Sequence, residues 1–291
     1  MNILVTGSRG QLGSELQALS VRYPQHSFFF YDLPELDITN SEQINHICNA
    51  HHIEVIINAA AYTAVDKAES DAETAFRVNS DGAALLATYA KENHALLLHI
   101  STDYVFDGTS SVPYKESDPA TPLGVYGRSK WEGEERIRAI NPSHLIIRTS
   151  WLYSMYGANF IKTMLRLGGE RSEVRVVFDQ VGTPTWAADL AEALLSMLSS
   201  IYKGKHYSAT YHYSNEGVAS WYDVASAVME MSNLSCKVLP IESHDYPVPA
   251  PRPHYSVFNK AALKSDWNIS ISHWRTSLAA MLHSMKTSHH S

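Results

Sequence analysis

Tyr126 and Lys130 are the two residues whose types and spacing point most directly to chemistry. Side chains four positions apart on a helix face the same way, with their Cβ atoms roughly 5–6 Å apart. A phenol with a pKa near ~10 is a poor acid at neutral pH, and a neighbouring ammonium lowers that pKa by stabilising the phenolate. The pair predicts a proton-transferring tyrosine, although YxxxK alone also occurs by chance in many chains.

A hydroxyl that would complete this pair lies earlier in the chain, where an apolar run ends in Ser101, Thr102 and Asp103. Thr102 is the residue that we expect to bind a substrate carbonyl or to tune the tyrosine. Ser101 competes for that role, and either hydroxyl can instead satisfy backbone groups at a strand end.

A glycine-rich segment, GSRGQLG, contributes Gly7, Gly10 and Gly13 between an expected strand and an expected helix. Glycines in that position allow a tight turn, bring the backbone close to a pyrophosphate, and let the helix approach the strand. The helix N-terminus then offers free N–H groups and a partial positive charge to phosphates. The context predicts a dinucleotide-binding site.

Two acidic positions follow the next expected strand. Asp32 lies ~20 residues past the glycines, at the position where an acid binds the adenosine ribose in dinucleotide-binding folds. Asp37 and Ile38 form a second candidate, for the adenine, although Asp37 can also be a helix or turn cap. An acid here favours NADH by repelling a 2′-phosphate, whereas Arg9 in the glycine loop favours NADPH, so the sequence leaves that choice open.

Small residues end the third expected strand in the sequence NAAAYT at residues 58–63. They would let a cofactor lie flat against the strand ends, where open α/β sheets bind ligands. The alternative is tight helix packing, but the glycine loop makes the cofactor interpretation preferable.

The elements that must position these residues alternate along the first half of the chain. Apolar strands separated by helices indicate a parallel sheet covered on both faces, so we expect an α/β fold with a Rossmann-like doubly wound sheet. The expected strands are Asn2–Thr6, Ser27–Tyr31, Glu54–Asn58, Leu96–Ser101 and Leu145–Thr149, and the expected helices are Gln11–Val21, Ser41–Ala50, Ala72–Asn93 and Gly127–Ile140.

The regular alternation of expected strands and helices is lost after Trp151. Expected elements are a helix over Asn159–Leu167, a strand over Val174–Phe178 and a helix over Ala187–Leu198, and the proline-rich Tyr246–Pro253 fits neither a regular helix nor a central strand. We predict an NAD(P)-binding domain over 1–151 and a smaller, mainly substrate-binding domain over 152–291, with segments near 183–215 returning to the sheet.

Composition narrows the class of protein. The net charge is −7 and the chain has two cysteines without a CxxC pair, which argues against nucleic-acid binding, a disulfide framework and a thiolate metal site. No apolar run approaches the ~20 residues of a membrane span, and the N-terminus does not resemble a secretory signal. We therefore expect a cytoplasmic protein that binds neither nucleic acid nor membrane.

The ordered motifs resemble the extended short-chain dehydrogenase/reductases and, within them, the dTDP-4-dehydrorhamnose reductase family. The resemblance covers nearly the whole chain. It depends on VTGSRGQLGSEL, NAAAYTAVDKAE, HISTDYVFDG, PLGVYGRSKWEGE, RTSWLY, NFIKTMLRL and DQVGTPT. It implies hydride transfer from NADPH or NADH to the C4 ketone of dTDP-4-dehydro-L-rhamnose, giving dTDP-L-rhamnose.

The resemblance also implies roles for individual residues. Tyr126 would donate the proton, Lys130 would hold the nicotinamide ribose, and Thr102 would orient the carbonyl. Thr102, Asp103, Trp151 and Arg252 would contact the dTDP-sugar, with Arg252 near its pyrophosphate. NAD(P)H would contact Gly7, Gly10, Gln11, Leu12, Gly13, Asp32, Asp37, Ile38, Ala61, Tyr62, Thr63, Tyr126 and Lys130.

A metal ion is not supported by the sequence. Some members of the family bind magnesium at a homodimer interface through Glu15 and nearby acids, but Trp186 and Ala188 stand where some relatives carry a glycine and an acid. The adjacent histidines His51–His52 and His289–His290 lack convincing ligand spacing. A homodimer is compatible with the resemblance.

Two alternatives remain at this point. One is a nucleotide-sugar 4-epimerase or dehydratase of the same superfamily, which retains its cofactor. The other is a non-catalytic relative, of the kind represented by the regulatory β subunit of methionine adenosyltransferase. Trp151, Trp186 and Trp221 could stack a thymine or simply pack in the core.

Overall fold

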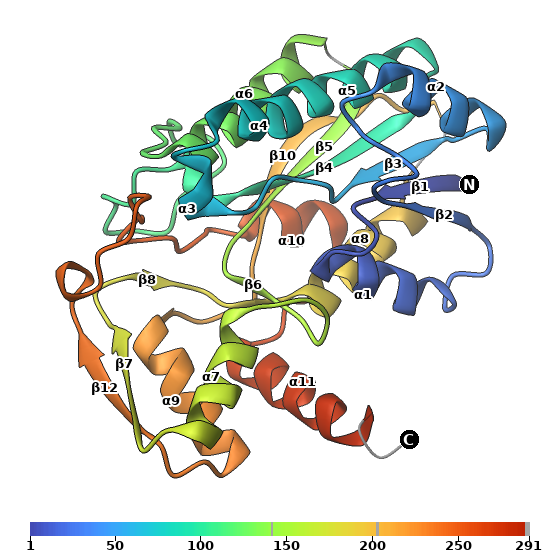
Figure 1. Cartoon of the computed structure of the whole chain (residues 1–291). Coiled ribbons are helices and arrows are strands. Elements are labelled where there is room, and N and C mark those ends of the chain that lie inside the picture. Colours follow the sequence, from blue (N-terminus) through green and yellow to red (C-terminus); the bar gives the residue numbers. More distant parts are fainter. Residues whose placement is uncertain (141, 202–203, 289–291) are drawn as a thin grey trace.

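The computed structural model describes residues 1–291 except 141, 202–203 and 289–291, so His289 and His290 lie outside the described residues. Its centre is a six-stranded sheet in which every neighbouring pair is parallel (Figure 1). Across the sheet the strands are β2 (Ser27–Tyr31), β1 (Asn2–Thr6), β3 (Val55–Asn58), β4 (Leu96–Thr102), β5 (Ser143–Thr149) and β10 (Ser208–Tyr213). The predicted doubly wound α/β sheet is confirmed.

The apolar strands are buried on both faces. Leu4, Ile56 and Leu97 lie side by side in register on one face, within the core that the covering helices complete. The next residues along the same strands, Val5, Ile57 and Leu98, belong to the core on the opposite face. This double burial explains why these strands read as continuous apolar runs rather than alternating patterns.

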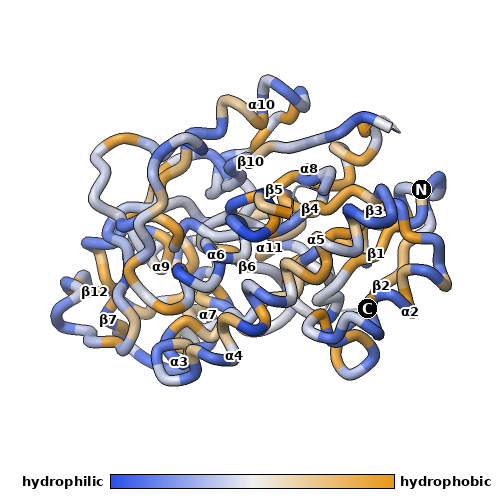
Figure 2. Tube along the Cα trace, turned by 90° about the horizontal axis from the view of Figure 1, so that it is seen from above, coloured by the Kyte–Doolittle hydropathy of each residue, from blue (hydrophilic) through white to orange (hydrophobic). Residues whose placement is uncertain are grey.

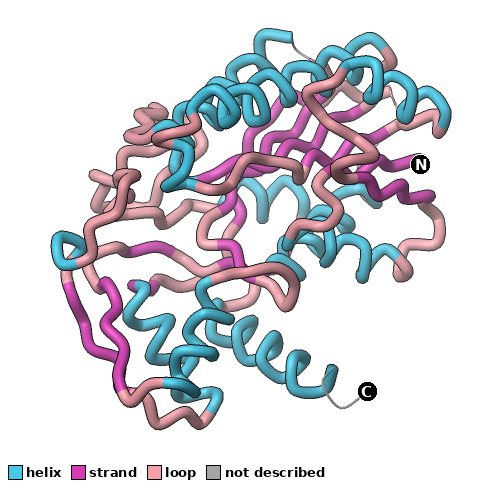
Figure 3. Tube along the Cα trace, viewed as in Figure 1, coloured by secondary structure: helices cyan, strands magenta, loops and turns pink. Residues whose placement is uncertain are grey.

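Helices cover both faces of the sheet, as Figure 3 shows by placing the strands between two layers of helices. In Figure 2 many helices alternate between hydrophilic and hydrophobic segments, as expected where one side faces a sheet and the other faces water. One core contains residues of α2 (Ser41–Ala50), α5 (Ala83–Glu92) and α6 (Val125–Ile140). The opposite core contains residues of α1 (Gln11–Ser20), α8 (Ala187–Ser199) and α10 (Ala261–Trp267).

The prediction of a single helix over Ala72–Asn93 is wrong for the middle of that range. The structure has α4 (Ala72–Phe76), a π-helical segment η1 (Arg77–Gly82), and then α5. Such a segment inserts extra backbone into a helix and is frequent at functional sites. Here the buried Asn79 side chain bonds to the backbone of Tyr62 and to the hydroxyl of Ser129, so tertiary hydrogen bonds accompany the departure from regular helix.

The second half adds a smaller layer beneath the sheet in the view of Figure 1. Its core joins apolar residues of three helices and a two-stranded parallel sheet. These are α7 (Phe160–Glu170), α9 (Trp221–Ser232), α11 (Trp274–Ser288), β7 (Glu173–Val177) and β12 (Lys237–Ile241). The short elements are β6 (Leu152–Tyr153), β8 (Val181–Gly182), β9 (Thr185–Trp186), β11 (Ala219–Ser220), α3 (Val65–Ala68), η2 (Asp103–Val105) and η3 (Ser243–Asp245).

Side-chain caps fix where several helices begin. Asn159 accepts a hydrogen bond from the backbone of Lys162 and starts α7, while Ser220 and Asp223 form a reciprocal capping box at α9. These oxygens satisfy N–H groups that have no partner inside the helix. None of the helices in the described part of the chain is both long and apolar enough to span a membrane.

A buried ion pair joins α6 to the sheet. The Glu134 carboxylate accepts hydrogen bonds from Arg148 Nη2 on β5 at 2.7 Å and from Ser101 Oγ on β4 at 2.5 Å. Arg138 Nη2 reaches the same carboxylate at 2.7 Å. Burial alone would raise the pKa of Glu134, but Arg148 and Arg138 hold it below its ordinary value of 4.5.

Replacing Arg148 with methionine should therefore lower the free energy of unfolding by about 3–5 kcal/mol, because it leaves a buried carboxylate short of a partner. Urea denaturation at pH 7 measures the loss. Arg138→Met is the matched control, since its side chain is 31% exposed and should cost much less. Equal losses for the two variants would contradict the prediction.

The same comparison has a pH dependence. The pKa of Glu134 is lower in the folded chain than its ordinary value of 4.5, so the stability that its ionised form contributes is complete above 4.5. That contribution is lost as the pH falls from there through the folded-state pKa. The difference between the native protein and Arg148→Met should shrink over this range.

Candidate active site

The predicted site residues other than Gly13, Tyr62 and Arg252 line a cavity of about 640 Å³ at the carboxyl ends of the central strands. The chain passes from β1 to β2 on one side and then crosses to β3 on the other, a reversal of strand order of the kind beside which open α/β sheets bind ligands. The cavity is lined from both halves of the chain. Its lining includes Gly7, Gly10, Gln11, Leu12, Asp32, Asp37, Ile38, Ala61, Thr63, Thr102, Asp103, Tyr126, Lys130, Trp151 and Trp221.

The glycine loop has the geometry of a phosphate cradle. Gly7 has a φ of +65°, and a Cβ there would lie 2.6 Å from the backbone nitrogen of Ala60. A Cβ on Gly13 would overlap the Gly7 carbonyl oxygen. Gly10 precedes α1, whose first turn has no acidic side chain and no side-chain cap, so N–H groups at the helix start are free to hold an anion.

Both acids predicted to contact the adenosine, Asp32 at the ribose and Asp37 at the adenine, bond to nearby backbone. Asp32 accepts hydrogen bonds from the backbone nitrogens of Arg9 at 2.9 Å and Leu33 at 2.8 Å. Asp37 accepts from the backbone and hydroxyl of Thr39, both at 2.8 Å. Asp37 thus forms a local turn while lining the cavity, and the cap of α2 is Asn40 instead.

The Arg9 guanidinium is not free for the cofactor alone, because it bonds to two neighbouring residues. Its guanidinium donates to the Glu35 carboxylate at 2.8 Å and to the Leu33 carbonyl at 2.6 Å. Both Arg9 and Glu35 are largely exposed, with side-chain accessibilities of 63% and 49%. The positive charge expected to favour a 2′-phosphate is therefore partly balanced by an acid that the sequence reasoning did not single out.

The segment after β3 contributes unequally. Ala61 and Thr63 line the cavity, whereas the Tyr62 hydroxyl donates to Asp71 at 3.1 Å. The Tyr62 backbone is held on both sides by the Asn79 side chain, at 2.8 and 3.1 Å. Sequence reasoning missed Asn79, although the poor helix formers at residues 79–82 (NSDG) within an expected helix were a signal.

Ser101 and Thr102 both line the cavity, but their hydroxyls have different partners. Ser101 donates to Glu134, inside the buried ion pair. Thr102 Oγ1 donates to Asp103 at 3.1 Å, accepts from the backbone of Tyr104 at 3.2 Å, and contacts the phenol of Tyr126. These contacts favour Thr102 as the hydroxyl that acts with Tyr126.

Tyr126 is buried, and the ring edge of Tyr104 packs against it at 5.4 Å between centroids. Burial raises the pKa of its phenol, and the hydrogen bond with Thr102 offsets this only in part. The expectation that Lys130 lowers this pKa is not met. The Lys130 ammonium donates instead to the carbonyl of Ile100 at 2.7 Å, and burial lowers its own pKa to about 8.

Asp103 is an unusual acid in this site. It is 3% exposed, and one of its carboxylate oxygens has no hydrogen-bond partner among the described residues. Burial raises the pKa of Asp103 to about 6, although hydrogen bonds with Ser256 and Thr102 act in the opposite direction. A buried acceptor without a partner is a position where a ligand donor can bind.

Trp151 stacks on Trp221, with ring centroids 3.6 Å apart and planes inclined by 8°. Trp151 has a left-handed φ of 50°, which is uncommon for a bulky residue and marks a locally determined turn after β5. Both rings line the cavity, which joins Trp221 of α9 to the site. Trp186 packs against the core of the smaller layer, as Trp151 and Trp221 also do, but it is not among the residues that line the cavity.

Arg252 does not line the cavity, unlike the other expected substrate ligands. It donates to Asp66 at 2.7 Å and its guanidinium lies 5.9 Å from the centre of the Tyr104 ring. Its Nη1 atom is buried without a partner among the described residues. The expected pyrophosphate ligand is thus held by an ion pair behind Tyr104 rather than in the cavity lining.

Glu15, which some members of the family use to bind magnesium, is buried within the fold of this chain. Glu15 is 5% exposed and accepts from Ser154 Oγ at 2.7 Å. Burial raises the pKa of Glu15. No group of three or more His, Cys, Asp or Glu side chains within the described residues is arranged to hold a metal ion.

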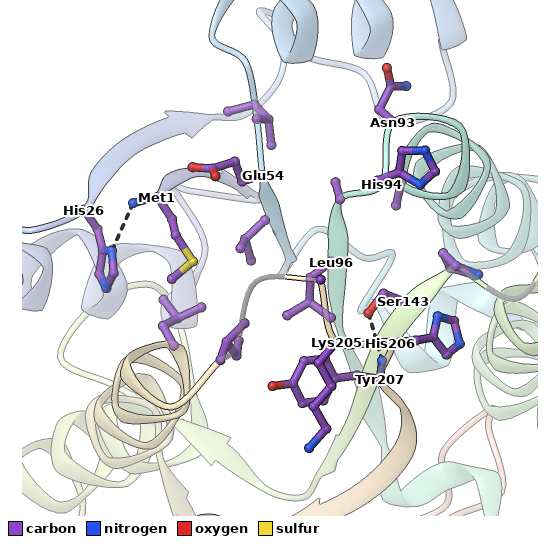
Figure 4. A pocket seen from close by; sticks show the side chains of 18 of the residues that line it. Met1, His26, Glu54, Asn93, His94, Leu96, Ser143, Lys205, His206 and Tyr207 are labelled. Atoms are coloured by element: carbon purple, nitrogen blue, oxygen red, sulfur yellow. Dashed lines mark hydrogen bonds between the residues drawn. The ribbon is translucent and has the colours of Figure 1, made fainter.

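A larger cavity, of about 1110 Å³, opens at the opposite, amino-terminal ends of the strands (Figure 4). Met1, His26 and Glu54 lie on one side of it, and Lys205, His206 and Tyr207 on another. The hydroxyl, lysine and glycine positions discussed above all belong to the carboxyl-end cavity. Size alone therefore does not identify the functional site.

The sequence matches known proteins over nearly its whole length. Residues 1–287 match the family described as RmlD substrate binding domain. A dTDP-4-dehydrorhamnose reductase of Aggregatibacter actinomycetemcomitans is 41% identical over 284 residues, which cover 95% of this chain and 96% of the relative. The chain belongs to the dTDP-4-dehydrorhamnose reductase family.

Two further proteins are similar to this chain over nearly its whole length. The spore coat polysaccharide biosynthesis protein SpsK of Bacillus subtilis is 39% identical over 280 residues, 96% of each chain. The crystal structure of a dTDP-4-dehydrorhamnose reductase from Bacillus anthracis in complex with NADP has a TM-score of 0.91 and 36% identity, covering 97% of this chain and 99% of that one. The predicted family is confirmed, in preference to the epimerases and dehydratases.

Cofactor preference should respond to the Arg9–Glu35 pair. Glu35→Gln should lower the KM for NADPH relative to that for NADH by about two- to threefold, since it frees the Arg9 guanidinium for a 2′-phosphate and exposed pairs are weak. Arg9→Met should shift the ratio the other way. The KM values for both cofactors give the measurement.

Glu170→Gln is the matched control, because it removes a similarly exposed pair, with Arg166 at 2.9 Å, from the end of α7. It should leave the cofactor ratio unchanged. A ratio that moves equally in Glu35→Gln and Glu170→Gln would argue against a role for Glu35.

Proposed function

We propose that this protein reduces the C4 ketone of dTDP-4-dehydro-L-rhamnose to dTDP-L-rhamnose, with NADPH or NADH as the hydride donor. The observation that carries the proposal is the meeting of Tyr126, Thr102 and Lys130 in the cavity that also contains the glycine loop. Family membership and the NADP complex of the Bacillus anthracis relative support the substrate and the cofactor class.

The residues present fit a dinucleotide. Gly7 and Gly13 allow the loop to pack tightly against backbone that a Cβ would strike, and the start of α1 offers N–H groups to phosphates. Asp32 and Asp37 lie farther along the same cavity, where a ribose and an adenine would sit, and Ala61 and Thr63 would face the middle of the cofactor. When bound, NAD(P)H supplies the hydride.

Tyr126 is assigned as the general acid. Its raised pKa keeps the phenol protonated at neutral pH, so it holds a proton to give when negative charge develops on the substrate oxygen. The Thr102 hydroxyl, which donates to Asp103 in this structure, would turn to donate to the same oxygen, and the two donors would then stabilise the alkoxide that forms. Lys130 would hold the nicotinamide ribose beside them.

Asp103 and Trp151 are assigned to the sugar nucleotide. The unpaired, buried carboxylate oxygen of Asp103 is an acceptor for a sugar hydroxyl, and the Trp151–Trp221 stack offers a flat apolar surface. Arg252 would reach the pyrophosphate only after exchanging its bond to Asp66.

The division of labour follows the two layers of the fold. We propose that residues 1–151 bind the dinucleotide and that residues 152–291 mainly bind the substrate, with α8 and β10 belonging structurally to the first layer. A non-catalytic regulatory role is less well supported, because Tyr126, Thr102 and Lys130 are all retained and lie in one cavity.

Tyr126→Phe tests the chemistry. It should leave the Kd for NADPH within about twofold and lower kcat by a factor of about 10²–10⁴, because only the transferable proton is removed. Tyr114→Phe is the control, since it deletes another buried hydroxyl, one bonded to Asp107 at 3.0 Å. A turnover near that of the native protein in Tyr126→Phe would refute the assignment.

The substrate is tested by supplying dTDP-4-dehydro-L-rhamnose with NADH and NADPH in separate reactions. We expect the cofactor to be consumed and dTDP-L-rhamnose to form, identified by chromatography against a standard. Failure to consume either cofactor, or purification with tightly bound NAD⁺ and conversion without net oxidation, would point to another reaction.

A further inference from the structure

Three polar side chains lie next to one another inside the sheet. Thr6, Asn58 and His99 are aligned in register, Thr6 and Asn58 as the last residues of β1 and β3 and His99 in the middle of β4, and each is 1% exposed. Two residues earlier, the same face carries an entirely apolar row. Buried polar groups are tolerated when they are hydrogen-bonded, so this row requires partners.

The row forms a chain of contacts that ends on the lysine of the cavity. Thr6 Oγ1 lies 2.7 Å from Asn58 Oδ1, and Asn58 Nδ2 lies 3.0 Å from His99 Nδ1. His99 Nε2 lies 3.4 Å from Lys130 Nζ. Thr6, at the other end of this chain of four side chains, immediately precedes Gly7 of the glycine loop.

The Lys130 ammonium has three hydrogens to donate and cannot accept a hydrogen bond. One hydrogen is donated to the Ile100 carbonyl at 2.7 Å, and a second faces His99 Nε2. Because an ammonium is tetrahedral, these two contacts fix the direction of the third hydrogen. Lys130 also lines the cavity, where that third hydrogen can be donated to a ligand.

We propose that His99 is a positioning residue for Lys130: its Nε2 atom accepts one ammonium hydrogen, so that another is aimed at the ribose hydroxyls of a bound dinucleotide. The inference rests on the proposed function for the identity of that ligand. His99 does not line the cavity, and it acts only through the lysine.

The hydrogen-bonding logic of the chain specifies the protonation of His99. Burial lowers the pKa of His99 well below its ordinary value, and the charges of Lys130, His144 and Arg138 act in the same direction, so the ring is neutral. If Nε2 accepts from Lys130, the single ring hydrogen resides on Nδ1 and must be donated to the Asn58 side-chain oxygen. In the structure the Asn58 amide nitrogen faces Nδ1 and the amide oxygen accepts from Thr6, so the proposal includes a half-turn of the Asn58 amide. After that turn the amide nitrogen faces the Thr6 hydroxyl, which can accept.

The opposite arrangement has a different consequence. If Asn58 donated to Nδ1, the ring hydrogen would lie on Nε2 and would face Lys130. Lys130 could accept it only as a neutral amine, which has no charge to offer a ribose. Glu134, one turn along α6, raises the pKa of Lys130 against the effect of burial, which favours the ammonium and hence the Nδ1–H form of His99.

The tautomer is measurable in the native protein. ¹⁵N chemical shifts of the imidazole nitrogens at neutral pH, assigned by the signal lost in His99→Gln, should show a protonated Nδ1 and an unprotonated Nε2. An Nε2–H tautomer would overturn the proposal. The measurement needs no variant if the signals are assigned by scalar couplings that connect the ring to the backbone of His99.

Two substitutions of His99 separate positioning from simple packing. In His99→Gln the longer amide can place an acceptor near Lys130, whereas in His99→Asn the shorter amide reaches only the position of Nδ1. We expect NADPH to bind about tenfold more weakly to His99→Asn, the loss of roughly one hydrogen bond to a charged group. Binding to His99→Gln should recover most of that loss.

His144→Asn is the matched control. His144 is another buried histidine, 2% exposed, on the neighbouring strand β5, and its Nδ1 bonds to the Pro142 carbonyl at 3.0 Å. Its substitution should lower thermal stability and leave the Kd for NADPH unchanged. Equal weakening in His99→Asn and His144→Asn, or no recovery in a folded His99→Gln, would refute the positioning role.

The outcome is independent of the sugar substrate. NADPH binding is followed by fluorescence with no dTDP-sugar present, so a protein that failed to turn over dTDP-4-dehydro-L-rhamnose could still show the expected dependence on His99. Conversely, normal turnover with no dependence of NADPH binding on His99 would reject the inference and leave the proposed function standing.

Discussion

Two guanidinium groups and one hydroxyl converge on the buried carboxylate of Glu134, and the position of α6 depends on that convergence. Arg148 comes from β5 and Ser101 from β4, while Glu134 itself lies one helical turn beyond Lys130. A buried carboxylate is tolerated only when its bonds are complete, so the helix has little freedom to slide or rotate over the sheet. The cavity inherits this rigidity, because Tyr126 and Lys130 project from the same helix.

Sequence predicted the parts of this arrangement that depend on neighbours along the chain. The glycine loop, the apolar strands, the end of β4 at Thr102 and the Tyr126–Lys130 spacing are all local patterns, and their order gave both the fold class and the family. His99, Asn79 and the Glu134–Arg148 pair could not be predicted, because each depends on the register or packing of segments that are distant in sequence. Asn79 left only a weak local trace, in the poor helix formers around it.

The spacing of Tyr126 and Lys130 predicted a shared helix face but not the direction of the ammonium, which turns to the carbonyl of Ile100. Desolvation therefore dominates both groups, raising the pKa of the phenol and lowering that of the ammonium. A raised pKa keeps the proton on the phenol at neutral pH, and the alkoxide that forms beside it is basic enough to take that proton.

The Trp151–Trp221 stack joins the two layers of the protein through ring faces, because Trp151 follows β5 and Trp221 begins α9. Flat, nearly parallel rings resist separation, which would expose both faces to water, but they have no interlocking shape that opposes sideways displacement. Because both residues line the cavity, the shape of that wall depends on the contact between the turn after β5 and the start of α9.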